Sequence, residues 1–224
     1  MPSITIGNNT GDTYSGTEDA WLRQYQNTYN YGGWSEMNVQ RYASGNHSTS
    51  CLKFSGISSI PTGATITAAS IFIYKHNGTS DNNTITVKRL LRNWVEGTSE
   101  GTDRVLETPH SCCWDEYGND QPWTSGGALS DGNDRDSTTS ATTVVSSTGR
   151  YYEFTSAQII SDVQAFLSGT YSNYGWVLER TDGTNDNTYN SFRTSEGTDG
   201  QRPYLSVTYT TGGMANNYYY QMQM

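Results

Sequence analysis

Aromatic side chains crowd the first part of this chain, and their types suit the recognition of carbohydrates. Sugars stack their C–H faces on exposed aromatic rings, while a few polar or cationic groups fix hydroxyls or uronates. Further aromatic and lysine side chains are expected on neighbouring strands. The candidate sugar-binding residues are Trp21, Tyr25, Tyr31, Trp34, Lys53, Tyr74, Lys75 and Lys88. The alternative is that these rings only close the edges of a β-sandwich.

Acidic loops supply a second kind of candidate chemistry. Oxygen-rich loops can clamp Ca²⁺, although none of these loops has the spacing of an EF-hand. The candidate ligands are Asp115, Asp120, Asp182 and Asp186. Solvated loops without an ion are the alternative, so no cofactor is firmly predicted and Ca²⁺ is the one candidate.

The sequence offers little for catalysis. The three histidines, His47, His76 and His110, lack the two-histidine spacing of a metal-binding helix. There is no Gly-x-Ser-x-Gly nucleophile elbow. Spacing along the chain cannot place two carboxylates across a glycosidic bond. We therefore predict a protein that is not an enzyme.

Composition limits the class of partner. The chain of 224 residues carries a net charge of −9 and no basic tract, which argues against nucleic-acid binding. No stretch is apolar enough to insert into a membrane, and the N-terminal residues lack the pattern of a signal peptide. The three cysteines include a vicinal pair, which predicts buried small side chains rather than a disulfide framework.

Alternating patterns predict the elements that must position these residues. Strands are expected at 36–42, 50–54, 69–74, 84–89, 151–154, 176–180, 189–194 and 204–209. Residues 156–167 change to a helical period, with Ser156 as N-cap and Gly169 just past the end. The polar stretch 96–150 is expected to be functional or folded on its own contacts. The fold class is all-β: an antiparallel β-sandwich or jelly roll with one short helix and long loops.

Three parts of the chain follow from this pattern. Residues 1–18 are expected to form an irregular N-terminal arm, 19–211 the sandwich, and 212–224 a C-terminal tail. The tail has no core alternation but is rich in tyrosine and methionine, and such exposed apolar clusters mark contacts. The predicted assembly contacts are Met214, Tyr218, Tyr219, Tyr220 and Met222.

Short motifs spread along the chain resemble the DNRLRE domains, a group related to carbohydrate-binding modules and to disaggregatase-type domains. The resemblance covers about residues 12–211, and it lies in the order of the motifs more than in any one of them. The motifs include Asn30-Tyr31-Gly32, Asn93-Trp94-Val95-Glu96-Gly97, Cys113-Trp114-Asp115, Asn173-Tyr174-Gly175, Ser195-Glu196 and Arg202-Pro203-Tyr204-Leu205. It implies a β-sandwich and, through the related modules, binding of an acidic polysaccharide. Glu96 and Glu196 are expected to be polar anchors that fix loops.

Three functions remain open at this point, and a polysaccharide-degrading enzyme ranks last among them. The first is a non-catalytic structural or adhesive component of a bacteriophage virion, of capsid-decoration or tail-fibre type, with homo-oligomer or virion-protein partners and with glycan binding as an additional role. The alternative is a secreted or surface carbohydrate-binding module that recognises a polysaccharide. Each of these two predicts a virion or extracellular location.

Overall fold

A computed structural model describes residues 1–7, 16–42, 46–182 and 187–211. Its strands are β1 Ser3–Gly7, β2 Thr17–Arg23, β3 Tyr29–Asn30, β4 Glu36–Arg41, β5 His47–Phe54, β6 Thr65–Gly78, β7 Asn83–Arg89, β8 Thr102–Asp103, β9 Glu116–Gly118, β10 Gln121–Pro122, β11 Ala141–Val145, β12 Arg150–Thr155, β13 Trp176–Arg180, β14 Thr188–Arg193 and β15 Tyr204–Thr210. The helices are α1 Ala157–Ser168 and the short 3₁₀ turns η1 Gln24–Gln26, η2 Ser55–Ser59 and η3 Arg104–Leu106.

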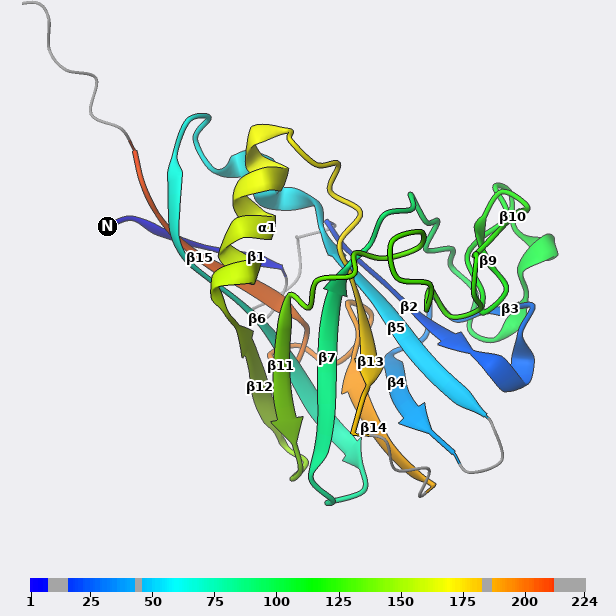
Figure 1. Ribbon diagram of the computed structural model, residues 1–224. Coiled ribbons are helices and arrows are strands. Elements are labelled where there is room, and N and C mark those ends of the chain that lie inside the picture. The colour runs from blue at the N-terminus through cyan, green and yellow to red at the C-terminus, as the bar shows by residue number, and fades with distance from the viewer. Residues whose placement is uncertain (8–15, 43–45, 183–186, 212–224) are drawn as a thin grey trace, which may run out of the picture.

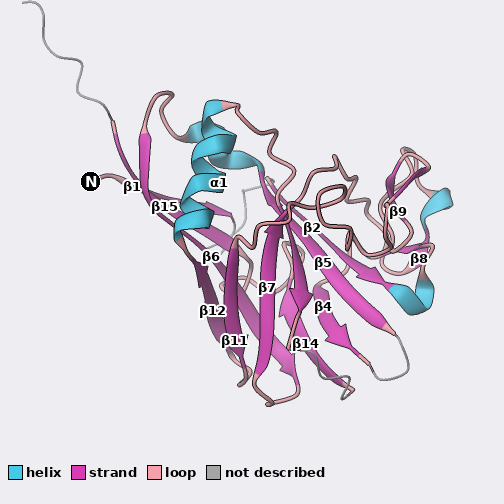
Figure 2. Ribbon diagram, in the orientation of Figure 1, coloured by secondary structure: helices cyan, strands magenta, loops and turns pink. Residues whose placement is uncertain are grey.

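Eleven of these strands form one antiparallel sheet that curls over to enclose a core (Figures 1 and 2). One half follows the order β1-β15-β6-β14-β4 with β12 beside β6, and the other follows β5-β13-β7-β11 with β2 beside β5. The pairing of β4 with β5 joins the halves. This architecture confirms the all-β sandwich with one α-helix.

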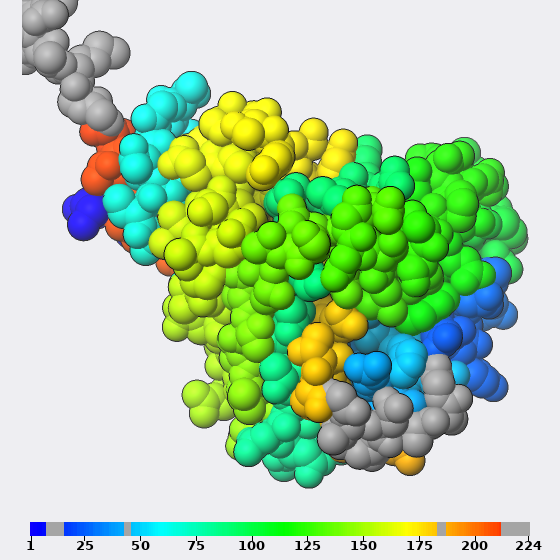
Figure 3. All heavy atoms as spheres, viewed as in Figure 1, coloured from blue at the N-terminus to red at the C-terminus, as the bar shows by residue number. Residues whose placement is uncertain are grey.

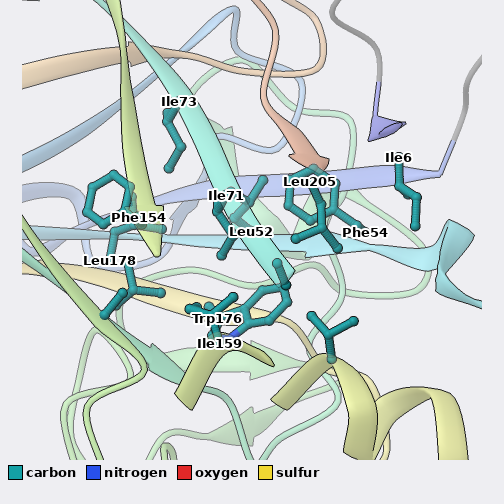
Figure 4. Close-up of a cluster of buried hydrophobic side chains, with 14 of the residues drawn as sticks. Ile6, Leu52, Phe54, Ile71, Ile73, Phe154, Ile159, Trp176, Leu178 and Leu205 are labelled. Atoms are coloured by element: carbon teal, nitrogen blue, oxygen red, sulfur yellow. The ribbon is translucent and has the colours of Figure 1, made fainter. Parts of the chain in front are cut away.

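The main core lies between the two halves of the sheet (Figure 4). Side chains alternate along each strand, so Ile71 and Ile73 of β6 face Leu52 of β5 and Leu178 of β13 across the interior. Trp176 lies at the centre and is fully buried.

Helix α1 covers one end of the sandwich, and its ends follow from the sequence as expected. The Ser156 hydroxyl accepts hydrogen bonds from the backbone N–H groups of Gln158 and Ile159, at 3.0 and 3.1 Å. Gly169 ends the helix with a φ of 73°, a left-handed conformation that favours glycine. The capped helix presents Ile159, Val163 and Phe166 to the core.

Replacing Ser156 by alanine is expected to lower the free energy of unfolding by about 1 kcal/mol, because two backbone donors lose their acceptor. Urea unfolding of the full chain measures this change. Ser161, whose hydroxyl bonds only within the helix on its exposed side, is the matched control. An equal loss in Ser161→Ala would contradict the capping role.

A second hydrophobic cluster lies on the outer side of β2, β5 and β13. Segment 90–136 crosses this face and covers it (Figure 3, green). The buried residues of this second cluster are Ala20, Leu22, Cys51, Leu90, Trp94, Cys112, Trp114, Trp123, Ala128 and Val177. The polar stretch 96–150 is therefore not folded on its own contacts alone: it packs on this face of the sheet, and its residues Ala141–Val145 join the main sheet as β11 beside β7, a strand that the sequence pattern did not predict.

Three further expectations meet the structure here. The N-terminal arm is not irregular throughout, because Ile4 and Ile6 alternate and β1 pairs with β15, which buries Ile6. All three cysteines are free and buried, as predicted. The five predicted contacts of the tail, Met214, Tyr218, Tyr219, Tyr220 and Met222, lie outside the described residues.

Candidate functional site

The N-terminal aromatics form one connected cluster at the end of β2. The rings of Trp21 and Tyr31 lie with centroids 4.9 Å apart, and those of Tyr31 and Trp34 meet edge to face at 6.1 Å. Trp21 and Tyr31 are buried, whereas Trp34 is 37% exposed and Tyr25 is 70% exposed. The two buried rings support the outer ones, and Tyr25 and Trp34 are the rings that a ligand can reach.

Arg23 links the exposed Tyr25 to this cluster. Its guanidinium carbon lies 5.0 Å from the Trp21 ring centroid and 5.6 Å from that of Tyr25. One guanidinium nitrogen donates to Gln26 at 2.6 Å. Within the described residues no carboxylate forms an ion pair with Arg23, so its charge is available to an anionic ligand.

Sequence reasoning did not select Arg23. The signal was present, because Arg23 follows Trp21 by two residues and therefore lies on the same face of β2. We call the surface formed by Arg23, Tyr25 and Trp34, together with the buried Tyr31 ring that supports it, the aromatic–arginine surface.

Close backbone contacts hold the segment that carries Trp34. A Cβ on Gly32 would lie 2.2 Å from the carbonyl oxygen of Glu96, and one on Gly33 would lie 2.3 Å from that of Thr98. The Asn30 side chain bridges the same segments, since its amide donates to the Glu96 carbonyl at 2.5 Å and its oxygen accepts from the Ser99 N–H at 3.2 Å. Only glycine fits this approach, and the result is a preformed loop under Trp34.

A shallow pocket of about 180 Å³ opens beside the Trp34 ring. Its lining residues are Gly33, Trp34, Ser35, Glu100 and Glu196. A larger depression of about 500 Å³ lies between residues 95–98 and 106–109. Among the lining residues that the structure describes there, none carries an aromatic ring, so stacking on a sugar favours the Trp34 pocket.

Three carboxylates from distant parts of the chain meet next to that pocket. Asp19 of β2, Glu96 and Glu196 each place an oxygen within 4.8 Å of the others. Glu96 accepts a hydrogen bond from the Asp19 N–H at 2.6 Å, and Asp19 accepts one from the Ser195 N–H at 2.8 Å. Glu96 thus anchors β2, whereas Glu196 is exposed and, among the described residues, accepts only from the adjacent Ser195 hydroxyl at 2.8 Å, so the structure does not give Glu196 the anchoring role expected for it.

The surroundings of this cluster disfavour its charge. Burial, followed by the charges of Glu196 and Glu96, raises the pKa of Asp19 well above its usual value. Burial also raises the pKa of Glu96, to about 8. No sequence motif signals the cluster, since Asp19 is 77 residues from Glu96 along the chain.

Comparison with known families connects this end of the molecule to a function. Residues 11–104 match the model of carbohydrate-binding module family 96. The matched range contains the whole aromatic–arginine surface and two of the three clustered carboxylates. The match supports a relation of the chain to carbohydrate-binding modules, which are non-catalytic. No curated protein matches the chain, and the narrower assignment to DNRLRE domains stays a prediction.

The predicted lysines do not form a basic patch, which corrects that expectation. Lys53 pairs with Glu18 at 2.6 Å and Lys88 pairs with Asp131 at 2.7 Å, and both side chains are largely buried. Lys75 is fully buried and donates to the carbonyl oxygens of Thr79 and Ser146. None of the three presents a free charge to a polysaccharide.

The burial of Lys75 predicts a dependence of stability on pH. Burial lowers its pKa from the usual 10.5 to about 8, against the opposing charge of Asp81. Between about pH 8 and 10.5 the unfolded chain therefore binds more protons at this residue than the folded chain does, and stability rises with pH. As the pH rises from about 8 to 10.5, we therefore expect the wild type to gain unfolding free energy relative to Lys75→Met. A pH-independent difference in urea unfolding would contradict the buried charge.

Tyr74 lies on a different part of the surface from Trp34's cluster. It belongs to a half-buried aromatic row on the outer face of β6, β12 and β15, where it meets Tyr151 edge to face at 5.2 Å. Tyr151 meets Tyr204 in the same way, and Phe72 stacks on Tyr204 at 4.6 Å. These rings pack on one another, and the row covers the outer face of β6, β12 and β15.

Three of the carboxylates predicted to bind Ca²⁺ have protein partners in the structure. Asp115 accepts from the Asn27 amide at 2.5 Å, and Asp120 accepts from Arg104 and His110 at 3.1 and 2.7 Å. These two partners lower the pKa of Asp120. Asp182 pairs with Arg180 at 2.8 Å, and Asp186 lies outside the described residues. In the part of the chain that the structure describes, the cluster of potential metal ligands is the one around Asp19.

Proposed function

We propose that this protein binds a polysaccharide without cleaving it, and that the glycan lies on the aromatic–arginine surface. The observation that carries the proposal is the exposed Trp34 ring beside a pocket, within the residues that match a carbohydrate-binding module. The buried Tyr31 ring and the glycine contacts hold Trp34 before any ligand arrives, which lowers the entropic cost of binding.

An acidic polysaccharide is the ligand class that Arg23 suits, and because Glu100 and Glu196 line the pocket beside Trp34, the acidic group of such a ligand has to lie at Arg23 rather than in that pocket. The rings of Tyr25 and Trp34 supply stacking area, and the Arg23 guanidinium can pair with a uronate. The net charge of −9 gives no general attraction to polyanions, so an acidic glycan has to be recognised through local contacts of this kind.

Affinity electrophoresis of the full chain tests the proposal against immobilised polysaccharides. The panel contains polyuronates such as alginate and polygalacturonate, together with neutral glucans and xylans. We expect retardation by at least one polyuronate and no release of reducing ends. Retardation by neutral glycans alone would contradict the acidic class, and no retardation by any glycan would contradict carbohydrate binding.

A role in a bacteriophage virion, with oligomeric or virion partners and a virion or extracellular location, stays a prediction. It rests on residues 212–224, which lie outside the described residues. Sedimentation of the full chain and of a chain lacking 212–224 would test it, since the tail is expected to hold the oligomer together.

A further inference from the structure

The carboxylates of Asp19, Glu96 and Glu196 converge from three separate segments. Asp19 belongs to β2, Glu96 to the segment after β7, and Glu196 to the turn after β14. One oxygen of each lies within 4.8 Å of the other two. Two oxygens bound to one Ca²⁺ at about 2.3–2.6 Å are at most about 5 Å apart, so the cluster has the spread of a calcium site.

A buried orphan oxygen is the second, independent observation. Asp19 is fully buried, and its Oδ2 accepts from the Ser195 N–H at 2.8 Å. Its Oδ1 is buried with no hydrogen-bond partner among the described residues. A buried polar atom without a partner is costly, and a buried carboxylate is normally paired or bound to a metal.

Among the described residues, no side-chain cation forms an ion pair with this cluster. Lys53 is close enough to lower the pKa of Glu96, but its ammonium is engaged by Glu18 at 2.6 Å. The described residues give no ion pair to Asp19, Glu96 or Glu196. Three carboxylates in one spot therefore need either shared protons or an external cation.

We propose that Asp19, Glu96 and Glu196 bind a Ca²⁺ ion. All three ligands are carboxylates, and the group includes no histidine or cysteine, which favours a hard cation over zinc. Oxygen ligands spread over up to 4.8 Å suit Ca²⁺ better than the tighter octahedral shell of Mg²⁺.

The ion ties the sheet to the loop under Trp34. Glu96 belongs to the segment that contacts Gly32 and Asn30, and Glu196 lines the Trp34 pocket. Binding of Ca²⁺ therefore stabilises the folded chain and holds the pocket wall in place. This inference does not depend on glycan binding, because the site is complete without a sugar.

Thermal unfolding and calorimetry of the full chain, in the absence of glycan, test the site. After treatment with EDTA and its removal, the protein is titrated with CaCl₂ or MgCl₂ at pH 7.5. We expect a saturable heat with Ca²⁺. We also expect Tm to rise by about 5–10 °C once Ca²⁺ reaches about 100-fold above Kd.

Variants separate the site from general ion effects. Glu196→Gln changes an exposed residue and is expected to fold normally, yet to lose most of the Ca²⁺ shift. Asp19→Asn should lose the shift as well. The matched control is Asp115→Asn, which alters a carboxylate outside the cluster and should keep the full shift.

Three outcomes would overturn the proposal. Wild type with the same Tm in EDTA and in millimolar Ca²⁺ would show that protons hold the cluster together. An equal shift with Mg²⁺ would overturn the assignment to Ca²⁺. A full Ca²⁺ shift in both Glu196→Gln and Asp19→Asn would place the ion elsewhere.

Discussion

Trp176→Ala is expected to lower the free energy of unfolding by about 3–5 kcal/mol. Trp176 is fully buried between the halves of the sheet, with the rings of Phe54 and Phe166 at 6.5 and 5.3 Å. Removing the indole leaves a cavity that strands on both sides prevent from closing. It also takes a hydrogen-bond donor, 3.0 Å away, from the buried carboxylate of Asp162.

Urea unfolding at equilibrium measures this loss, and Trp34→Ala provides the matched control. It makes the same substitution at a ring that is 37% exposed, so the expected change is less than about 1 kcal/mol. Equal losses in the two variants would contradict the assignment of Trp176 to the core and of Trp34 to the surface.

Trp34→Ala is expected to weaken the binding of the polysaccharide at least about tenfold, about 1.4 kcal/mol or more. The substitution removes the exposed ring beside the pocket, while Trp21 and Tyr31 keep the underlying packing. Tyr25→Ala should weaken binding in the same direction. Arg23→Gln should weaken binding of a polyuronate more than that of a neutral glycan, because it removes the positive charge that lies between the Trp21 and Tyr25 rings.

Tyr171→Ala is the control for these binding variants. Tyr171 is 46% exposed and stacks on Arg89 at 3.9 Å, away from the aromatic–arginine surface. Its loss should leave the affinity unchanged. If Tyr74→Ala abolished binding and Trp34→Ala did not, the glycan would lie on the outer face of β6 instead.

Much of the fold follows from local pattern. Alternation marks the strands that flank the core, and Ser156 and Gly169 mark both ends of α1, because caps satisfy backbone groups within a few residues. The same alternation that places Tyr74 on the outer face of β6 places Lys75 inside with Ile73. Lys75 was expected on the surface because of its charge, but its position in the alternation of β6 places it in the interior.

The site was predictable only in part. The aromatic cluster could be anticipated because its members are close along the chain, but which rings are exposed depends on how residues 30–33 cross 96–99. The carboxylate cluster depends on the packing of three segments far apart in sequence, which no local spacing encodes. The partners of Asp115 and Asp120 could not be anticipated, because Asn27 and Arg104 belong to other segments of the chain. Asp182 pairs with Arg180, only two residues away.

In the part of the chain that the structure describes, no helix is both long and apolar enough to cross a membrane.

The match to a carbohydrate-binding module and the exposed Trp34 ring together make a glycan the central expectation.

Calorimetric titration of the full chain with soluble polyuronate fragments, repeated with Trp34→Ala, tests this expectation most directly. We predict saturable binding by wild type, binding weakened at least about tenfold in Trp34→Ala, and an intact polysaccharide afterwards. Equal affinity in the two proteins, or cleavage of the polysaccharide by wild type, would contradict a non-catalytic glycan site at Trp34.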